Sequence, residues 1–105
     1  MIVHVVEFRW NDSVTDAAVD ELEDALRAFV KLTTGVRSYR FGRNLGLRPG
    51  TADFALVAYF ENPEDVPAYL DHPAHLELVK RCIDPILKER TTVHFEAGPD
   101  YADEL

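Results

Sequence analysis

Short runs of β-branched and aromatic residues along the chain predict four β-strands. The runs cover residues 2–10 (IVHVVEFRW), 36–45 (VRSYRFGRNL), 53–60 (DFALVAYF) and 91–97 (TTVHFEA). Residues 46–52 (GLRPGTA) contain the glycine and proline that typically interrupt regular structure, so they predict a loop between the second and third strands.

The first helix is predicted between the first two strands, where apolar residues recur at helical spacing. These residues are Val19, Leu22, Leu26, Phe29 and Val30. Ser13 or Thr15 can cap the N-terminus of this helix, because a side-chain oxygen there accepts a free backbone N–H. Gly35 follows in the usual stop position.

Two more helices are predicted after the third strand, with a proline between them. Asn62 and Pro63 suit a helix start, as cap and as first helical residue. The residue before a proline avoids helical geometry, so the pair His72-Pro73 makes the first of these helices short. The second is predicted from about Pro73 to about Lys88. Its buried stripe is expected to consist of Leu76, Val79, Ile83, Ile86 and Leu87.

The element order β-α-β-β-α-α-β predicts an α+β fold. It is the ferredoxin-like unit, with a four-stranded antiparallel sheet and helices on one face. We expect this domain to cover residues 2–97, followed by a polar C-terminal tail over residues 98–105.

The third strand is apolar on both of its faces. One face carries Phe54, Leu56, Ala58 and Phe60, and the other carries Ala55, Val57 and Tyr59. Strands of this kind are covered on both sides. The rest of the chain is too short to supply a second cover, so we predict a homodimer in which two sheets face each other as a dimeric α/β barrel. The alternative is a monomer with one sheet face partly wet.

Charge and composition narrow the possible partners and location. The net charge is -8 over 105 residues, which argues against nucleic acid as a partner. No apolar segment is long enough to span a membrane, and the N-terminus does not resemble a signal peptide. The single cysteine, Cys82, cannot form an internal disulfide and fits a reducing cytoplasm.

Four segments, taken in order, resemble the Dabb family of stress-responsive dimeric α/β-barrel domains, and within it the olivetolic acid cyclase-like proteins. The segments are HVVEFRW (4–10), VRSYRFGRNL (36–45), YLDHPAHLELV (69–79) and RTTVHFE (90–96). The most specific element is the motif Tyr-x-x-His-Pro-Ala-His at residues 69–75.

The resemblance implies a fold and a set of site residues. The family fold is a ferredoxin-like unit whose dimer forms a barrel. In the plant cyclase of this family, which closes a linear polyketide into an aromatic ring without a cofactor, the working residues match Tyr69 and His75, and a further histidine matches His4. The cyclase has another histidine where this chain carries Phe54, so the resemblance implies a difference at this substrate-site position.

The residues themselves are compatible with acid–base chemistry. A histidine can take and return a proton near neutral pH, and a tyrosine hydroxyl can hold a developing oxyanion. His75 falls in the first turn of the last helix and borders its buried stripe, while His4 shares a strand face with Val6 and Phe8. Polar groups on two apolar faces can meet in a cavity between sheet and helices. Tyr69 and His75 are therefore the candidate catalytic residues, and His4, Phe54 and His72 the candidate substrate contacts.

Each of these residues also has a structural interpretation. His72 precedes Pro73, where its side chain can cap the following helix. Tyr69 and His75 can instead be a hydrogen-bonded pair that holds two helices together, and His4 a satisfied core histidine. His94 alternates with two apolar neighbours and is expected to point away from them, into the dimer interface.

Two functions stay open at this point. One is a cofactor-independent enzyme for a small apolar, carbonyl-rich ligand, either a cyclase or a cofactor-free monooxygenase. The other is a non-catalytic stress or assembly protein. We expect no side-chain metal site, because His72 and His75 have no third and fourth ligand nearby. We expect no cofactor. Some members of the family that the chain resembles bind magnesium through backbone carbonyl groups after the first helix. The matching positions here are near Val30, Thr33 and Val36.

Overall fold

The structure, a computed structural model, describes residues 1–104. Its sheet is formed by β1 (Ile2–Trp10), β2 (Val36–Arg43), β3 (Phe54–Phe60) and β4 (Leu87–Glu96). The main helices are α1 (Asp16–Val30), α2 (Asp65–Leu70) and α3 (Pro73–Leu78). A π-helical turn (Val79–Ile83) and a 3-10 turn (Asp84–Ile86) connect α3 to β4, and a second 3-10 turn (Tyr101–Glu104) lies in the tail.

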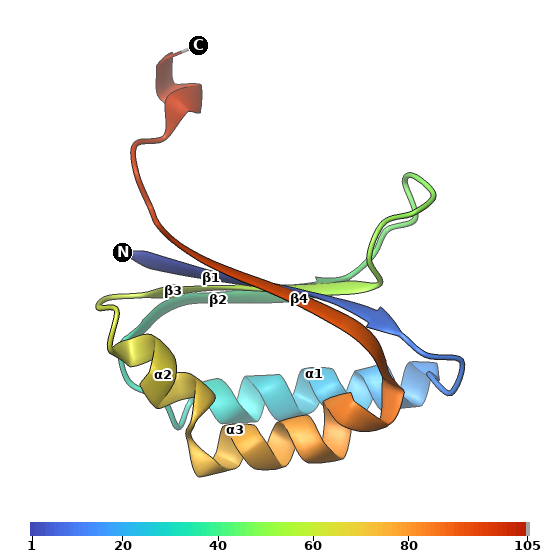
Figure 1. Cartoon of the computed structure of the whole chain (residues 1–105). Coiled ribbons are helices and arrows are strands. Elements are labelled where there is room, and N and C mark those ends of the chain that lie inside the picture. The colour runs from blue at the N-terminus through green and yellow to red at the C-terminus, as the bar shows by residue number, and fades with distance from the viewer. Residues whose placement is uncertain (105) are drawn as a thin grey trace.

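The sheet has the strand order β2-β3-β1-β4, and all three neighbouring pairs are antiparallel. This is the ferredoxin-like α+β fold that the sequence predicted. The helices α1, α2 and α3 all lie on one face of the sheet, and none of them covers the other face (Figure 1).

The core lies between the sheet and α1. Leu22 and Phe60 are completely buried there, and Phe54 is 1% exposed. The buried residues of α1 are Val19, Leu22, Leu26 and Phe29, as the helical periodicity predicted. Thr15 caps this helix, because its hydroxyl oxygen accepts the N–H of Ala18 at 3.1 Å.

Two expected boundaries of the second helical region are wrong. The α2 helix begins at Asp65, and no side chain caps it, so the expected cap by Asn62 is absent. Instead, the carboxylate of Asp65 accepts the backbone N–H of Asn62 at 3.0 Å. The last helical turn ends at Ile86 instead of Lys88, and β4 begins immediately at Leu87.

The stripe expected on the last helix is also partly wrong. Leu76 is 57% exposed, whereas Leu78 and Cys82 are buried. The π-helical turn Val79–Ile83 adds a residue and rotates the side chains that follow it, but Leu76 and Leu78 precede it, so their exposure is set by the orientation of α3 itself. Ile83 and Ile86 are buried as expected.

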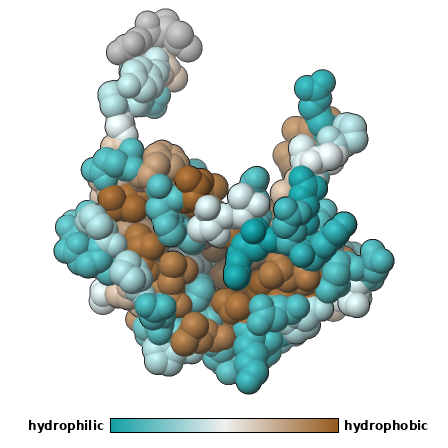
Figure 2. Space-filling model, in the orientation of Figure 1, coloured by the Kyte–Doolittle hydropathy of each residue, from teal (hydrophilic) through white to brown (hydrophobic). Residues whose placement is uncertain are grey.

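The face of the sheet opposite α1, α2 and α3 is partly apolar. Tyr59, Val93 and Phe95 are exposed on it. Tyr59 and Phe95 are the cross-strand partners of Val3, and Val93 is the partner of Val5. The β2–β3 loop and the C-terminal tail both rise from this side of the sheet (Figure 1). Figure 2 shows the two projections with a hollow between them. Within residues 1–104, no helix has the length and apolar character required to cross a membrane.

Candidate functional site

A cavity of about 470 Å³ lies between the helix-facing side of the sheet and the α3 region. This volume is within the usual range for small-molecule sites. Its apolar wall comes from both layers and consists of Val6, Phe8, Leu26, Leu56, Leu70, Leu76, Val79 and Ile83. Three of the predicted site residues, His4, Tyr69 and His75, line the same cavity. Figure 2 shows apolar side chains at the surface in the band between the two layers.

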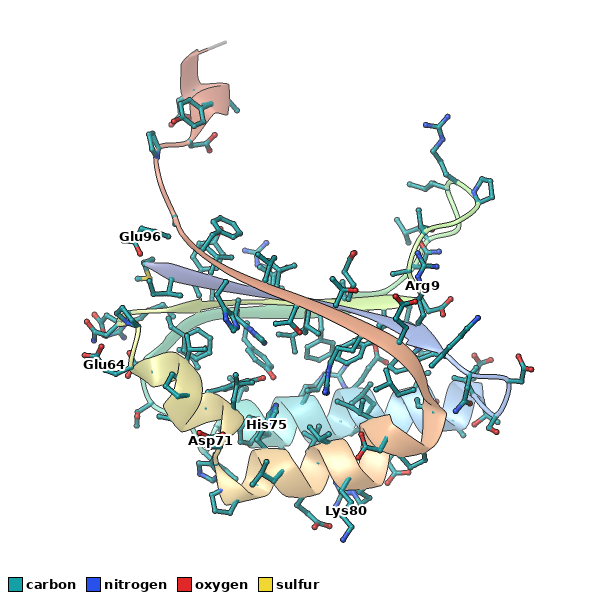
Figure 3. The ribbon with its side chains drawn as sticks, viewed as in Figure 1. Arg9, Glu64, Asp71, His75, Lys80 and Glu96 are labelled. Carbon is teal, nitrogen blue, oxygen red and sulfur yellow. The ribbon has the colours of Figure 1, made fainter. Side chains whose placement is uncertain are left out.

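His75 lies in the first turn of α3, on the side that faces the sheet (Figure 3), while Lys80 points away from it. Its Nδ1 is 3.0 Å from the carbonyl oxygen of Leu70. A carbonyl only accepts, so Nδ1 carries the proton and donates it, which leaves the lone pair of the neutral ring on Nε2. Burial lowers the pKa of His75, and the hydrogen bond to Leu70 partly opposes this effect. The ring is therefore a neutral base at pH 7.

Tyr69, from α2, is 4% exposed and lies directly beside His75, with ring centroids 4.9 Å apart. Its hydroxyl is 2.6 Å from the hydroxyl of Tyr39 on β2. Burial raises the pKa of Tyr69 to about 12, and the hydrogen bond with Tyr39 acts in the opposite direction. Tyr69 therefore keeps its proton at neutral pH and remains a hydrogen-bond donor.

His4 is 4% exposed and forms a pair with His94. Its Nδ1 is 2.7 Å from Nε2 of His94, and the two rings are stacked with centroids 4.9 Å apart. The expectation that His94 points into a dimer interface is wrong. His94 is the direct cross-strand partner of His4, so both side chains leave the sheet on the helix-facing side. Burial, and then the neighbouring His94 and His75, lower the pKa of His4 to about 4.

His72 and Phe54 are not among the residues that line this cavity. Nδ1 of His72 accepts the N–H of Ala74 at 3.0 Å, which is the capping interaction expected for it. Phe54 packs in an aromatic cluster with Phe8, Trp10 and Phe41. The structure therefore brings three of the five predicted site residues together and leaves these two outside.

Several site residues were missed from the sequence. Tyr39 and His94 pair with predicted residues, and the polar groups Asp84, Arg90 and Thr92 also line the cavity. Strand register would have identified two of them. His94 is opposite His4, and Tyr39 is opposite Ala58, which is itself opposite His4.

Of the three carbonyl groups named for a backbone magnesium site, that of Val30 is engaged within the turn after α1. The Val30 oxygen accepts both the N–H of Thr33, at 3.2 Å, and its hydroxyl, at 2.7 Å. Both lone pairs of that oxygen are thereby used within the turn. Among residues 1–104, no group of three or more His, Cys, Asp or Glu side chains could hold a metal ion.

Comparison with known proteins identifies relatives of the chain. The model of the Stress responsive A/B Barrel Domain, Dabb, matches residues 2–97. An uncharacterised protein of Streptomyces coelicolor is 32% identical over 77 residues, which cover 71% of this chain and 79% of that protein.

Solved structures extend the comparison. A dimeric ferredoxin-like protein of unknown function from Thermobifida fusca has a TM-score of 0.85 and 38% identity, and the match covers 91% of this chain and 90% of that one. A hydroxynitrile lyase from Passiflora edulis has a TM-score of 0.78 over 93% of this chain and 96% of that one, at 17% identity. At such identity, the likeness to the lyase concerns the fold alone.

Proposed function

The chain belongs to the stress responsive A/B barrel domain family, and from the geometry of the cavity we propose that it is a cofactor-independent enzyme of the polyketide cyclase-like kind. It removes a proton from a carbon next to a carbonyl group in a small apolar substrate. The observation that carries the proposal is the orientation of His75. Its Nδ1–H is bound to Leu70, so its basic Nε2 is unshared in a cavity with apolar walls.

In the proposed reaction, Nε2 of His75 takes the proton from the α-carbon, and the negative charge moves to the carbonyl oxygen. Tyr69 donates its O–H to that oxyanion, which requires Tyr39 to donate its own O–H to the oxygen of Tyr69. The enolate carbon then attacks a second carbonyl of the same molecule. A carbon–carbon bond forms, and the protonated His75 returns its proton to the new alkoxide.

The environment of His75 supports this role. Burial keeps the pKa of the ring below its ordinary value, so the base form is present at neutral pH. Tyr69 remains protonated under the same conditions and can act as donor. An assembly protein without chemistry would need these groups buried with no open space beside them, whereas here they border a cavity of about 470 Å³.

The proposal includes a homodimer built through the open sheet face. Tyr59, Val93 and Phe95 are exposed there at 38%, 53% and 51%. A second copy of the chain would cover them. The dimeric protein from Thermobifida fusca, at 38% identity, supports this arrangement.

Deuterium exchange tests the proposal without knowledge of the natural substrate. The probe is 2-tetralone, an apolar bicyclic ketone, and NMR follows exchange of its α-protons in D2O. We expect the protein to accelerate this exchange above the buffer rate. His75→Ala should reduce the catalysed rate by a factor of about 100 to 10,000, the usual loss for a general base.

The matched control is His72→Asn, which alters the neighbouring histidine of the same motif and keeps a capping acceptor. It should leave the exchange rate unchanged. Equal rates in wild type and His75→Ala, or no rate above buffer, would contradict the enzyme proposal and favour the stress or assembly function.

A further inference from the structure

The cavity has a second polar region, which the proposed acid–base chemistry does not use. On β4, Arg90 and Thr92 precede His94 at two-residue intervals on the helix-facing side, opposite Phe8 and Val6 of β1. The backbone positions of Arg90 and His94 are four residue steps apart along the strand, or about 13 Å. The cavity therefore has an acid–base region near His4 and a cationic region near Arg90, with apolar side chains between them.

The charge of Arg90 is not neutralised by a neighbouring carboxylate. Four other arginines, Arg27, Arg37, Arg43 and Arg81, form ion pairs within 4.0 Å. Arg90 forms none with the residues that the structure describes, although the chain has a net charge of -8. Of all the arginines, it alone lines this cavity. Its guanidinium is therefore available to a ligand.

We infer that the substrate is an organic acid whose carboxylate binds Arg90 while its carbonyl group lies between Tyr69 and His75. This inference rests on the proposed function and adds a substrate class to it. A guanidinium fork matches the two oxygens of a carboxylate, and the Thr92 hydroxyl can provide a further donor. The ligand body would lie along the apolar wall.

A singly charged carboxylate fits this region better than a phosphate. Only one cationic side chain lines the cavity, and Asp84 lines it as well. A dianionic phosphate would experience repulsion from Asp84 with a single positive partner. The Arg90 charge also reaches His75, where it helps to lower the pKa. A bound carboxylate would offset that effect and make His75 a stronger base in the complex.

Paired ligands that differ only in charge test the inference. The probes are 2-naphthoate and its neutral analogue 2-naphthamide, titrated by calorimetry into the full chain at pH 7.5. We expect wild type to bind the acid about three- to tenfold more tightly, a preference typical of a charge-assisted contact to a partly exposed arginine. In Arg90→Gln, the two affinities should become equal.

Lys88→Gln is the matched control. It removes the same charge from the same strand, at an exposed position that does not line the cavity. It should keep the preference for the acid. Loss of the preference in Lys88→Gln to the same extent would show a general charge effect and would overturn the inference.

The other outcomes separate the inference from the proposed function. Equal binding of both probes to wild type would overturn the carboxylate inference but leave the cavity as a ligand site. If neither probe binds to wild type, both the carboxylate inference and the proposed function are contradicted. A third probe is the coenzyme A thioester of 2-naphthoic acid. If its binding requires Arg90 while binding of the free acid does not, Arg90 binds the phosphates of the carrier and the inference is overturned.

Discussion

Two histidines of one short motif carry their protons on different ring nitrogens, because each has a different backbone partner. In His75, Nδ1 donates to the carbonyl of Leu70, so Nε2 is the basic atom. In His72, Nδ1 accepts the N–H of Ala74, so the proton lies on Nε2. The sequence Asp-His-Pro-Ala-His therefore separates a helix cap from a candidate base. Residue type alone could not distinguish them, since the difference depends on backbone groups that only the folded chain brings into place.

His4 should make stability depend on pH. Its pKa is about 4 in the folded state and 6.5 in the unfolded state, so the unfolded chain binds more protons between these values. The free energy of unfolding should therefore fall as the pH drops from 6.5 to 4, by up to about 3 kcal/mol from this group.

Urea denaturation of wild type and His4→Gln at several pH values measures this effect. The variant loses the histidine contribution while all carboxylates stay the same. The difference in unfolding free energy between the two proteins should therefore change through this window. Parallel curves would show that His4 keeps an ordinary pKa and that its pairing with His94 has no energetic consequence.

At the scale of elements, local sequence signals located most of the structure. The apolar spacing of α1, its Thr15 cap and the alternation of β3 all depend on residues close in sequence, and the structure confirms them. The π-helical turn after α3 could not be predicted in the same way. Its residues Val79–Ile83 fit an ordinary helix by propensity, and no local feature of the sequence marks the wider turn.

The cap of α3 should contribute measurable stability. His72→Ala removes the acceptor for the Ala74 N–H, and the unfolding free energy should decrease by about 1 kcal/mol. His72→Asn is the control, because asparagine is a good N-cap and should retain most of the stability. If both variants lose the same amount, the packing of the ring against Phe29 is responsible and not the cap.

At the scale of the whole molecule, the two sheet faces have different roles. The inner face carries the core and the cavity, and the outer face combines apolar side chains with two projecting segments (Figure 1). The sequence predicted both faces from the double apolar pattern of β3. It could not predict the partners Tyr39, His94 and Arg90, since their positions depend on the register between strands distant in sequence.

One aspartate on each face should distinguish these roles. Wild type should sediment at twice the chain mass of 11.9 kDa. Val57→Asp places a charge on the outer face and should give folded monomers. Phe54→Asp buries an unpaired carboxylate at a side chain that is 1% exposed, which costs several kcal/mol and should unfold the domain.

The control for this experiment is Ala17→Asp, which adds the same charge at an exposed position of α1 and should remain a folded dimer. Circular dichroism reports folding and sedimentation reports mass. A wild type that remains monomeric at micromolar concentration, or a dimeric Val57→Asp, would contradict a dimer formed through this face.

The proposed chemistry depends most directly on the protonation state of His75. Nitrogen-15 NMR of the uniformly labelled protein, recorded as a function of pH, measures both the tautomer and the pKa of each histidine ring. We predict that His75 is neutral at pH 7, with its proton on Nδ1, and titrates below 6.5. A His75 ring that carries its proton on Nε2, or that is still protonated at pH 7, would leave the cavity without a base and would contradict the proposed function.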